Sequence, residues 1–102
     1  MSRPSLLADA EATARLRELP GWRLEAGSLR RDFLFPDFAE AFAFMTRVAL
    51  AAEKMDHHPD WSNVWNRVSV SLSTHDAGGV TDNDIALAHF MDQAASEIVA
   101  PS

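Results

Sequence analysis

Cysteine is absent from the sequence. Its absence excludes disulfides, thiolate ligands for a metal and a cysteine nucleophile, and it leaves the redox compartment open. Long apolar runs are absent too, since no stretch approaches the roughly 18 apolar residues that a membrane span needs. The first residues, 1–12, lack the basic-then-apolar pattern of a signal peptide and contain acidic residues early. We therefore expect a soluble, cytoplasmic protein with no membrane-spanning segment.

Positive charge is scarce. The chain has 15 acidic residues against 9 lysines and arginines, for a formal net charge of -6. No basic run is long enough to follow a phosphate backbone, so direct nucleic-acid binding is not expected. Apolar residues still make up 47% of the 102 residues, which is enough to build the core of one domain spanning residues 1–102. Association of subunits would bury further surface of so small a chain.

Hydrophobic periodicity divides the chain into helices and paired strands. We expect a helix at Leu6–Leu19, strands at Trp22–Glu25 and Leu29–Phe35, a helix at Phe38–Met55, strands at Ser62–Asn66 and Arg67–Ser73, and a last helix that begins at Thr81. The strands come in pairs joined by short loops, which is typical of an antiparallel sheet. The predicted fold is therefore α+β, in the order α-β-β-α-β-β-α.

Two helices carry apolar stripes that we expect to face the core. In the long helix the stripe is Phe38, Phe42, Met45, Val48 or Ala49, and Ala52. In the last helix it is Leu87, Met91, Ala94 and Ile98. Thr81 is followed three residues later by Asp84, which has the form of a capping box with Asp in place of Glu or Gln.

Three of the 4 histidines stand where predicted elements end. His57 and His58 follow the long helix, and His75 follows the last strand. Glu53 lies one helical turn before His57 and would reach it if the helix continued. Imidazoles beside carboxylates suit proton transfer near neutral pH. Asp56, Asp60, Asp76 and Asp84 are the other carboxylates nearby in the sequence.

Plainer interpretations of these residues stay open. Adjacent histidines in an exposed turn are often ordinary polar residues. Three imidazoles and a carboxylate could also hold zinc, but no His-x-x-x-His pair is present, so we favour a site without metal. His89 has no partner pattern and receives no role. Trp22, Trp61 and Trp65 are typical packing residues, although one of them could line a ligand pocket.

Spaced polar residues give the chain a specific resemblance to the pterin-4a-carbinolamine dehydratases. The matching positions are Glu53, Asp56-His57-His58-Pro59, Trp65, His75 and Asp84, with further likeness at Phe44–Leu50, Asn63–Asn66, Leu72–His75 and Asp84–Ala88, and weakly at Pro20–Trp22. The resemblance implies a four-stranded antiparallel sheet with helices packed on one face. It also implies homodimers, often paired into tetramers, and no metal or organic cofactor.

The resemblance further implies a hydro-lyase reaction. The enzyme would convert 4a-hydroxytetrahydropterin into quinonoid dihydropterin and water, in tetrahydrobiopterin recycling after an aromatic amino acid hydroxylase. Water must leave C4a while a proton leaves N5, and this chemistry needs an acid and a base. The identity of the pterin side chain stays open.

Site residues follow from the resemblance by matched position. It implies catalytic roles for His57, His58 and His75, with His57 and His75 exchanging protons while His58 positions the substrate. Which histidine is the acid stays open. The implied pterin contacts are these histidines with Asp56, Ser73, Thr74, Asp76 and Trp22. Glu53 and Asp84 would orient imidazoles or hold the loop. Asp76 stands where some relatives carry Glu, and Trp65 stands where Tyr is common.

Two other functions stay open. Animal members of this family also join a homeodomain transcription factor and stabilise its dimer. The chain could therefore be a protein-binding coactivator or dimerisation module, with the long helix as its surface. The same fold could also act on another pterin, for instance one on a molybdenum-cofactor route.

Overall fold

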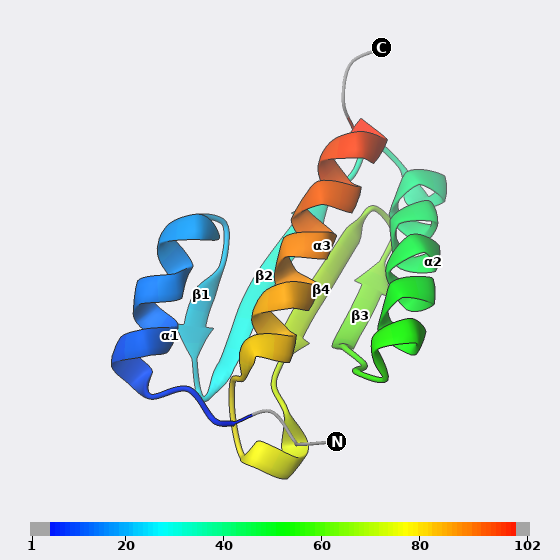
Figure 1. Cartoon of the computed structure of the whole chain (residues 1–102). Coiled ribbons are helices and arrows are strands. Elements are labelled where there is room, and N and C mark those ends of the chain that lie inside the picture. The colour runs from blue at the N-terminus through cyan, green and yellow to red at the C-terminus, as the bar shows by residue number, and fades with distance from the viewer. Residues whose placement is uncertain (1–4, 100–102) are drawn as a thin grey trace.

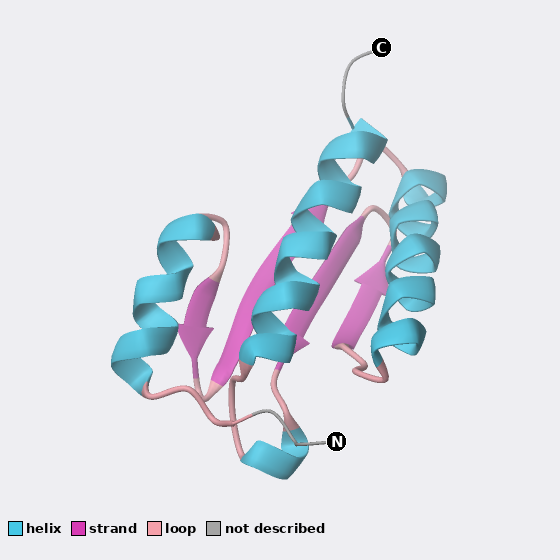
Figure 2. Cartoon of the chain, viewed as in Figure 1, coloured by secondary structure: helices cyan, strands magenta, loops and turns pink. Residues whose placement is uncertain are grey.

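The computed structural model describes residues 5–99. The elements in chain order are α1 (Asp9–Arg15), the 3-10 helix η1 (Leu16–Glu18), β1 (Arg23–Glu25), β2 (Ser28–Leu34), α2 (Phe38–Met55), β3 (Asp60–Val64), β4 (Arg67–Leu72), the 3-10 helix η2 (His75–Ala77) and α3 (Asp82–Val99). The strands form one antiparallel sheet in the order β1-β2-β4-β3. Helices α2 and α3 run across the same face of this sheet, and α1 lies beside β1 (Figures 1 and 2). The predicted α+β fold and its element order are confirmed.

Two tight turns build the hairpins of the sheet. Ala26 and Gly27 both have positive φ, 52° and 77°, which suits the two-residue turn between β1 and β2. In the second hairpin Trp65 has φ 50°, and the Asn63 side chain donates to the carbonyls of Trp65 and Arg67. This turn ends β3 at Val64, so the predicted strand at residues 62–66 lies too late in the chain.

The core lies between the sheet and the two long helices. Leu29, Phe33, Val68, Val70 and Leu72 are buried on the inner face of the sheet. The predicted stripe of α3 is confirmed at Leu87, Met91 and Ala94, which are buried, and at Ile98, which packs against the core. Alternation in the strands and the helical period in α3 therefore locate most of the core.

The stripe predicted for α2 is wrong at its amino-terminal end. Phe38 and Phe42 are 50% and 54% exposed. The helix instead buries a second stripe with the same period, Ala41, Phe44, Val48 and Ala52. The Phe44 ring packs 4.8 Å from that of Phe33, and small Ala41 lets the helix approach the sheet closely. Aromatic packing across the core thus decides which stripe faces inward.

The first helix is shorter than predicted. It begins at Asp9 rather than Leu6, because the N–H of Leu7 donates to the carbonyl of Val80 and this segment runs along the loop before α3. None of the helices within residues 5–99 is both long and apolar enough to cross a membrane.

Candidate active site

The end of α2 sets the positions of two neighbouring histidines. Asp56 follows the helix in the left-handed conformation, with φ 52°. This turn directs His57 inward, where it is 8% exposed, and leaves His58 on the surface. Glu53 would reach His57 only if the helix continued, but the helix ends at Met55 and the contact does not form. Oε1 of Glu53 lies 2.9 Å from Nε2 of His58 instead.

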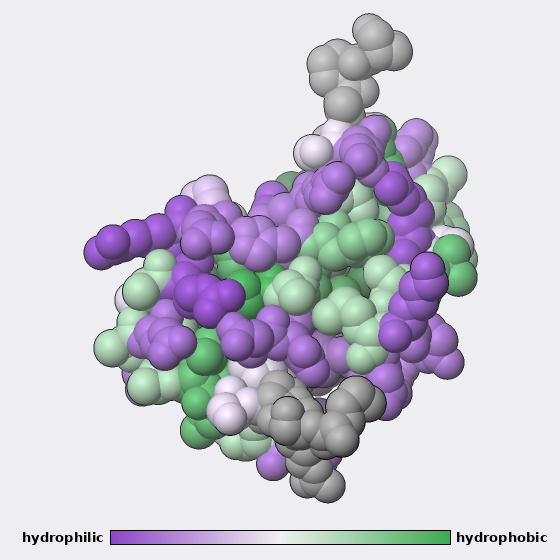
Figure 3. All heavy atoms as spheres, in the orientation of Figure 1, coloured by the Kyte–Doolittle hydropathy of each residue, from purple (hydrophilic) through white to green (hydrophobic). Residues whose placement is uncertain are grey.

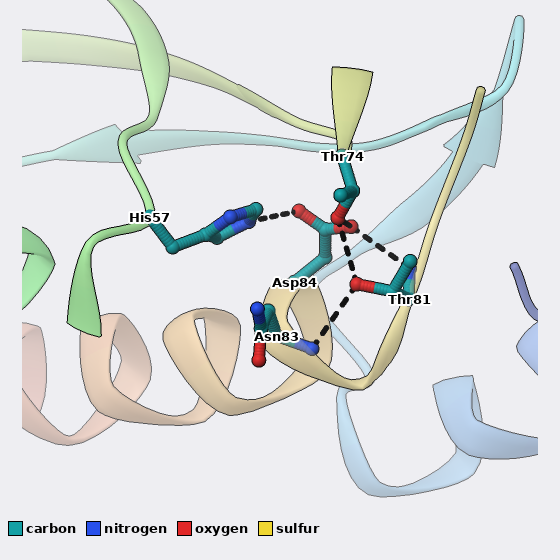
Figure 4. Close-up of polar contacts among 5 residues, drawn as sticks. All are labelled: His57, Thr74, Thr81, Asn83 and Asp84. Atoms are coloured by element: carbon teal, nitrogen blue, oxygen red, sulfur yellow. Dashed lines mark hydrogen bonds and ion pairs between the residues drawn. The ribbon is translucent and has the colours of Figure 1, made fainter. Parts of the chain in front are cut away.

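The start of α3 supplies a buried carboxylate to His57. The predicted capping box is confirmed, since Thr81 Oγ1 accepts the N–H of Asn83 and Asp84 Oδ2 accepts the N–H of Thr81. The other oxygen, Oδ1, lies 2.6 Å from Nε2 of His57. Figure 4 shows this carboxylate between the histidine and Thr74, whose hydroxyl donates to Oδ2. One side chain therefore both caps the helix and holds an imidazole.

The loop after β4 carries the third histidine. The N–H of Thr74 donates to the carbonyl of Gly79 at 2.7 Å, and its own carbonyl accepts the N–H of Ala77. Gly78, with φ 79°, allows this tight return. The loop holds His75 at its start with the side chain exposed.

These elements surround one cavity of about 550 Å³. This volume lies in the range of sites for small organic ligands. The cavity is lined by Asp56, His57, His58, Pro59, Asp60, Ser73, Thr74, His75, Asp76, Ala77 and Asn83. All three predicted histidines meet here, together with Asp56, Ser73, Thr74 and Asp76. Sequence reasoning did not assign Asn83, although its position directly before Asp84 could have pointed to it.

Three predicted residues do not line the cavity. Glu53 and Asp84 lie outside its lining, at 2.9 Å from Nε2 of His58 and 2.6 Å from Nε2 of His57. Trp22, expected as a pterin contact, is buried in the core against Phe33, and its Nε1 donates to Asp92 at 2.7 Å. Trp22 comes before β1, at the edge of the sheet farthest from β3, whereas the cavity lies at the ends of β3 and β4.

The cavity is suited to moving protons. Three imidazoles line it, and imidazole is the side chain used most often as a general acid or base. One ring nitrogen of His57 hydrogen-bonds to buried Asp84, and one ring nitrogen of His58 lies 2.9 Å from Glu53 at the surface. Among residues 5–99 no group of three or more His, Asp or Glu side chains is placed to hold a metal ion.

Comparison with known proteins identifies the family of this chain. The family model described as pterin 4 alpha carbinolamine dehydratase matches residues 5–94. A Mesorhizobium japonicum protein is 63% identical over 90% of this chain and 95% of its own length. A Synechococcus protein is 58% identical over 86% of this chain and 95% of its own length. Both carry the name "Putative pterin-4-alpha-carbinolamine dehydratase".

A solved structure agrees with these matches. The crystal structure of a transcriptional coactivator/pterin dehydratase from Brucella melitensis superposes with a TM-score of 0.85 at 46% identity. The match covers 87% of this chain and 97% of that one. From the family model, the curated relatives and the shared fold, we conclude that the chain belongs to the pterin-4a-carbinolamine dehydratase family.

Proposed function

We propose that the protein dehydrates a 4a-hydroxytetrahydropterin to quinonoid dihydropterin. In this reaction the C4a–O bond breaks, and the hydroxyl group takes up a proton and leaves as water. The N5 proton leaves as the double bond between C4a and N5 forms. His57 and His75 exchange these two protons, and His58 positions the substrate. The protein is then a hydro-lyase that needs no metal or organic cofactor.

The observation that carries this proposal is the convergence of the three histidines on one cavity. They come from two loops that are separated in sequence by β3 and β4. A bicyclic ring in the cavity would meet imidazoles from both loops, as a reaction with one proton arriving and one leaving requires. Asp56, Ser73 and Asp76 line the same space and are the further pterin contacts in this account.

Stopped-flow absorbance tests the reaction directly. The protein is mixed with freshly generated 4a-hydroxytetrahydropterin, and the uncatalysed dehydration is subtracted. We expect quinonoid dihydropterin to appear faster in proportion to the protein concentration. No acceleration by the folded protein contradicts the proposal. Comparing 4a-hydroxytetrahydropterins with different C6 side chains tests which pterin fits, with tetrahydrobiopterin recycling after an aromatic amino acid hydroxylase as the expected role.

A second candidate function is supported by the exposed side of α2. Phe38, Phe42 and Leu50 are 50%, 54% and 68% exposed there. Hydrophobic surface is also visible among the hydrophilic side chains over α2 and α3 (Figure 3). Such surface is typical of subunit or partner contacts, and the Brucella melitensis relative carries the name of a coactivator. The face would serve a homodimer or a dimer-of-dimers tetramer, or a protein-binding coactivator role. A pull-down that recovers no regulator, together with robust dehydratase activity, would remove the coactivator role.

A further inference from the structure

We propose that Thr74 is a positioning residue, whose hydroxyl directs the hydrogen bonds of Asp84 so that His57 presents Nδ1 to the ligand. The inference rests on the proposed dehydratase function and deepens it, because it names the ring nitrogen that exchanges protons. The family resemblance implies a different role for Thr74, a direct contact to the pterin. The two roles differ in what the hydroxyl group of Thr74 is bonded to.

The polar groups of Thr74 already have partners inside the protein. Its Oγ1 lies 2.9 Å from Asp84 Oδ2 and 2.7 Å from Thr81 Oγ1. Its N–H donates to the carbonyl of Gly79, and its carbonyl accepts the N–H of Ala77. A ligand would find at most one unused lone pair on Oγ1. The hydrogen bonds of the Thr74 hydroxyl are therefore made mainly with the protein, and little capacity is left for a ligand.

The direction of this network follows from counting donors and acceptors. Thr81 N–H donates to Asp84 Oδ2, and Thr81 Oγ1 accepts the N–H of Asn83. An ionised carboxylate has no proton to give, so the Thr74 hydroxyl donates to Oδ2. The Thr74 oxygen then accepts from the Thr81 hydroxyl. The Thr81 hydroxyl thus donates to the Thr74 hydroxyl, which in turn donates to Asp84.

This direction determines which nitrogen of His57 carries the proton. Asp84 is 0% exposed, and a buried carboxylate keeps its charge only when donors satisfy it. With Oδ2 satisfied by Thr74 and Thr81, Oδ1 accepts a hydrogen bond from the N–H at Nε2 of His57, with the two heavy atoms 2.6 Å apart. A protonated Asp84 would reverse this bond. Nε2 would then be the acceptor, and the proton of neutral His57 would sit on Nδ1.

The cavity receives the other ring nitrogen of His57. Nδ1 makes no hydrogen bond with residues 5–99, and the side chain lines the cavity, whereas Asp84 does not. Neutral His57 therefore has a lone pair on Nδ1, which takes up a proton, and the imidazolium returns a proton from the same atom. Whether the proton comes from N5 or goes to the 4a hydroxyl group, it passes through Nδ1, while Nε2 stays bonded to Asp84.

NMR of the wild-type protein gives the first test. Long-range 1H–15N spectra of the ligand-free protein, labelled at histidine nitrogens, distinguish protonated from unprotonated ring nitrogens. The His57 signals are assigned by their loss in His57→Ala. In neutral His57 we expect a proton on Nε2 and a bare Nδ1. A proton on Nδ1 overturns the proposal without any substitution at Thr74.

Substitution of Thr74 gives the second test. Thr74→Val removes the hydroxyl and keeps the shape, and Thr74→Ser returns the hydroxyl. We expect Thr74→Val to move the His57 proton from Nε2 in part of the molecules and to lower kcat by roughly tenfold or more, with KM within about twofold. Thr74→Ser should restore both. Thr46→Val is the matched control, since within residues 5–99 the Thr46 hydroxyl bonds only to the carbonyl of Phe42 in its own helix.

The outcomes separate this inference from the proposed function. An unchanged His57 tautomer in folded Thr74→Val contradicts the positioning role. A raised KM with unchanged kcat would make Thr74 a ligand contact and would also contradict it. If the wild type does not accelerate dehydration, the proposed function fails, and the spectra of the ligand-free protein still decide the role of Thr74.

Discussion

Nε2 of His57 lies 2.6 Å from Oδ1 of Asp84, across 27 positions of sequence. This hydrogen bond joins the loop after α2 to the first turn of α3. The same carboxylate caps α3 through the N–H of Thr81. The orientation of the imidazole is therefore tied to the folding of the helix, and substitutions at Asp84 should affect stability and turnover together.

Asp84→Ala should lower the free energy of unfolding by about 1–3 kcal/mol. The change removes a helix cap and leaves the Thr74 hydroxyl and the Thr81 N–H without their acceptor. Chemical denaturation measures the effect. Asp82→Ala is the matched control in the same helical turn, because Asp82 pairs with Arg15 at the surface. This substitution should lower the free energy of unfolding by less than about 1 kcal/mol. Equal losses in the two variants would show that the buried network adds nothing to stability.

Trp22→Phe should destabilise the protein without raising KM. The substitution keeps the aromatic contact with Phe33 but removes the Nε1 donor to Asp92, so about 1–3 kcal/mol of stability is lost. Denaturation and steady-state dehydration are measured on the same preparation. A raised KM with unchanged stability would instead support the pterin contact that the family resemblance implies.

The double substitution Phe38→Gln with Phe42→Gln should weaken self-association. Both rings are about half exposed and lie against each other, with centroids 5.8 Å apart, so their loss should change the stability of the fold itself by less than about 1 kcal/mol. Sedimentation velocity compares the assembly of the wild type and the variant. An unchanged sedimentation coefficient would place the subunit interface elsewhere.

Features that depend on residues close together in the sequence, such as helix ends and caps, could be predicted from the sequence. The bounds of α2 at Phe38 and Met55 are confirmed, as is the capping box of Thr81 and Asp84. The prediction for the face of α2 is wrong at Phe38 and Phe42, because the two apolar stripes of the helix share one period and only the packing of Phe44 against the sheet separates them.

Long-range contacts in the site could be predicted only in part. The resemblance to the dehydratase family implied that the three histidines would share one site, and all three line the same cavity. The partner of each imidazole depends on tertiary structure, since the end of α2 turns His57 away from Glu53 and toward Asp84. Trp22 shows the same limit. The family resemblance implies a pterin contact for Trp22 from its place in the sequence. Its hydrogen bond to Asp92 instead depends on the packing of α3 on the sheet.

The most direct test of the account is turnover of 4a-hydroxytetrahydropterin by His57→Ala and His75→Ala. His89→Ala is the matched control, because His89 is exposed on α3 and does not line the cavity. We predict that each of the first two variants loses roughly a hundredfold or more of the catalysed rate while remaining folded. The control should keep the wild-type rate. Wild-type turnover in folded His57→Ala or His75→Ala would contradict proton exchange by that histidine.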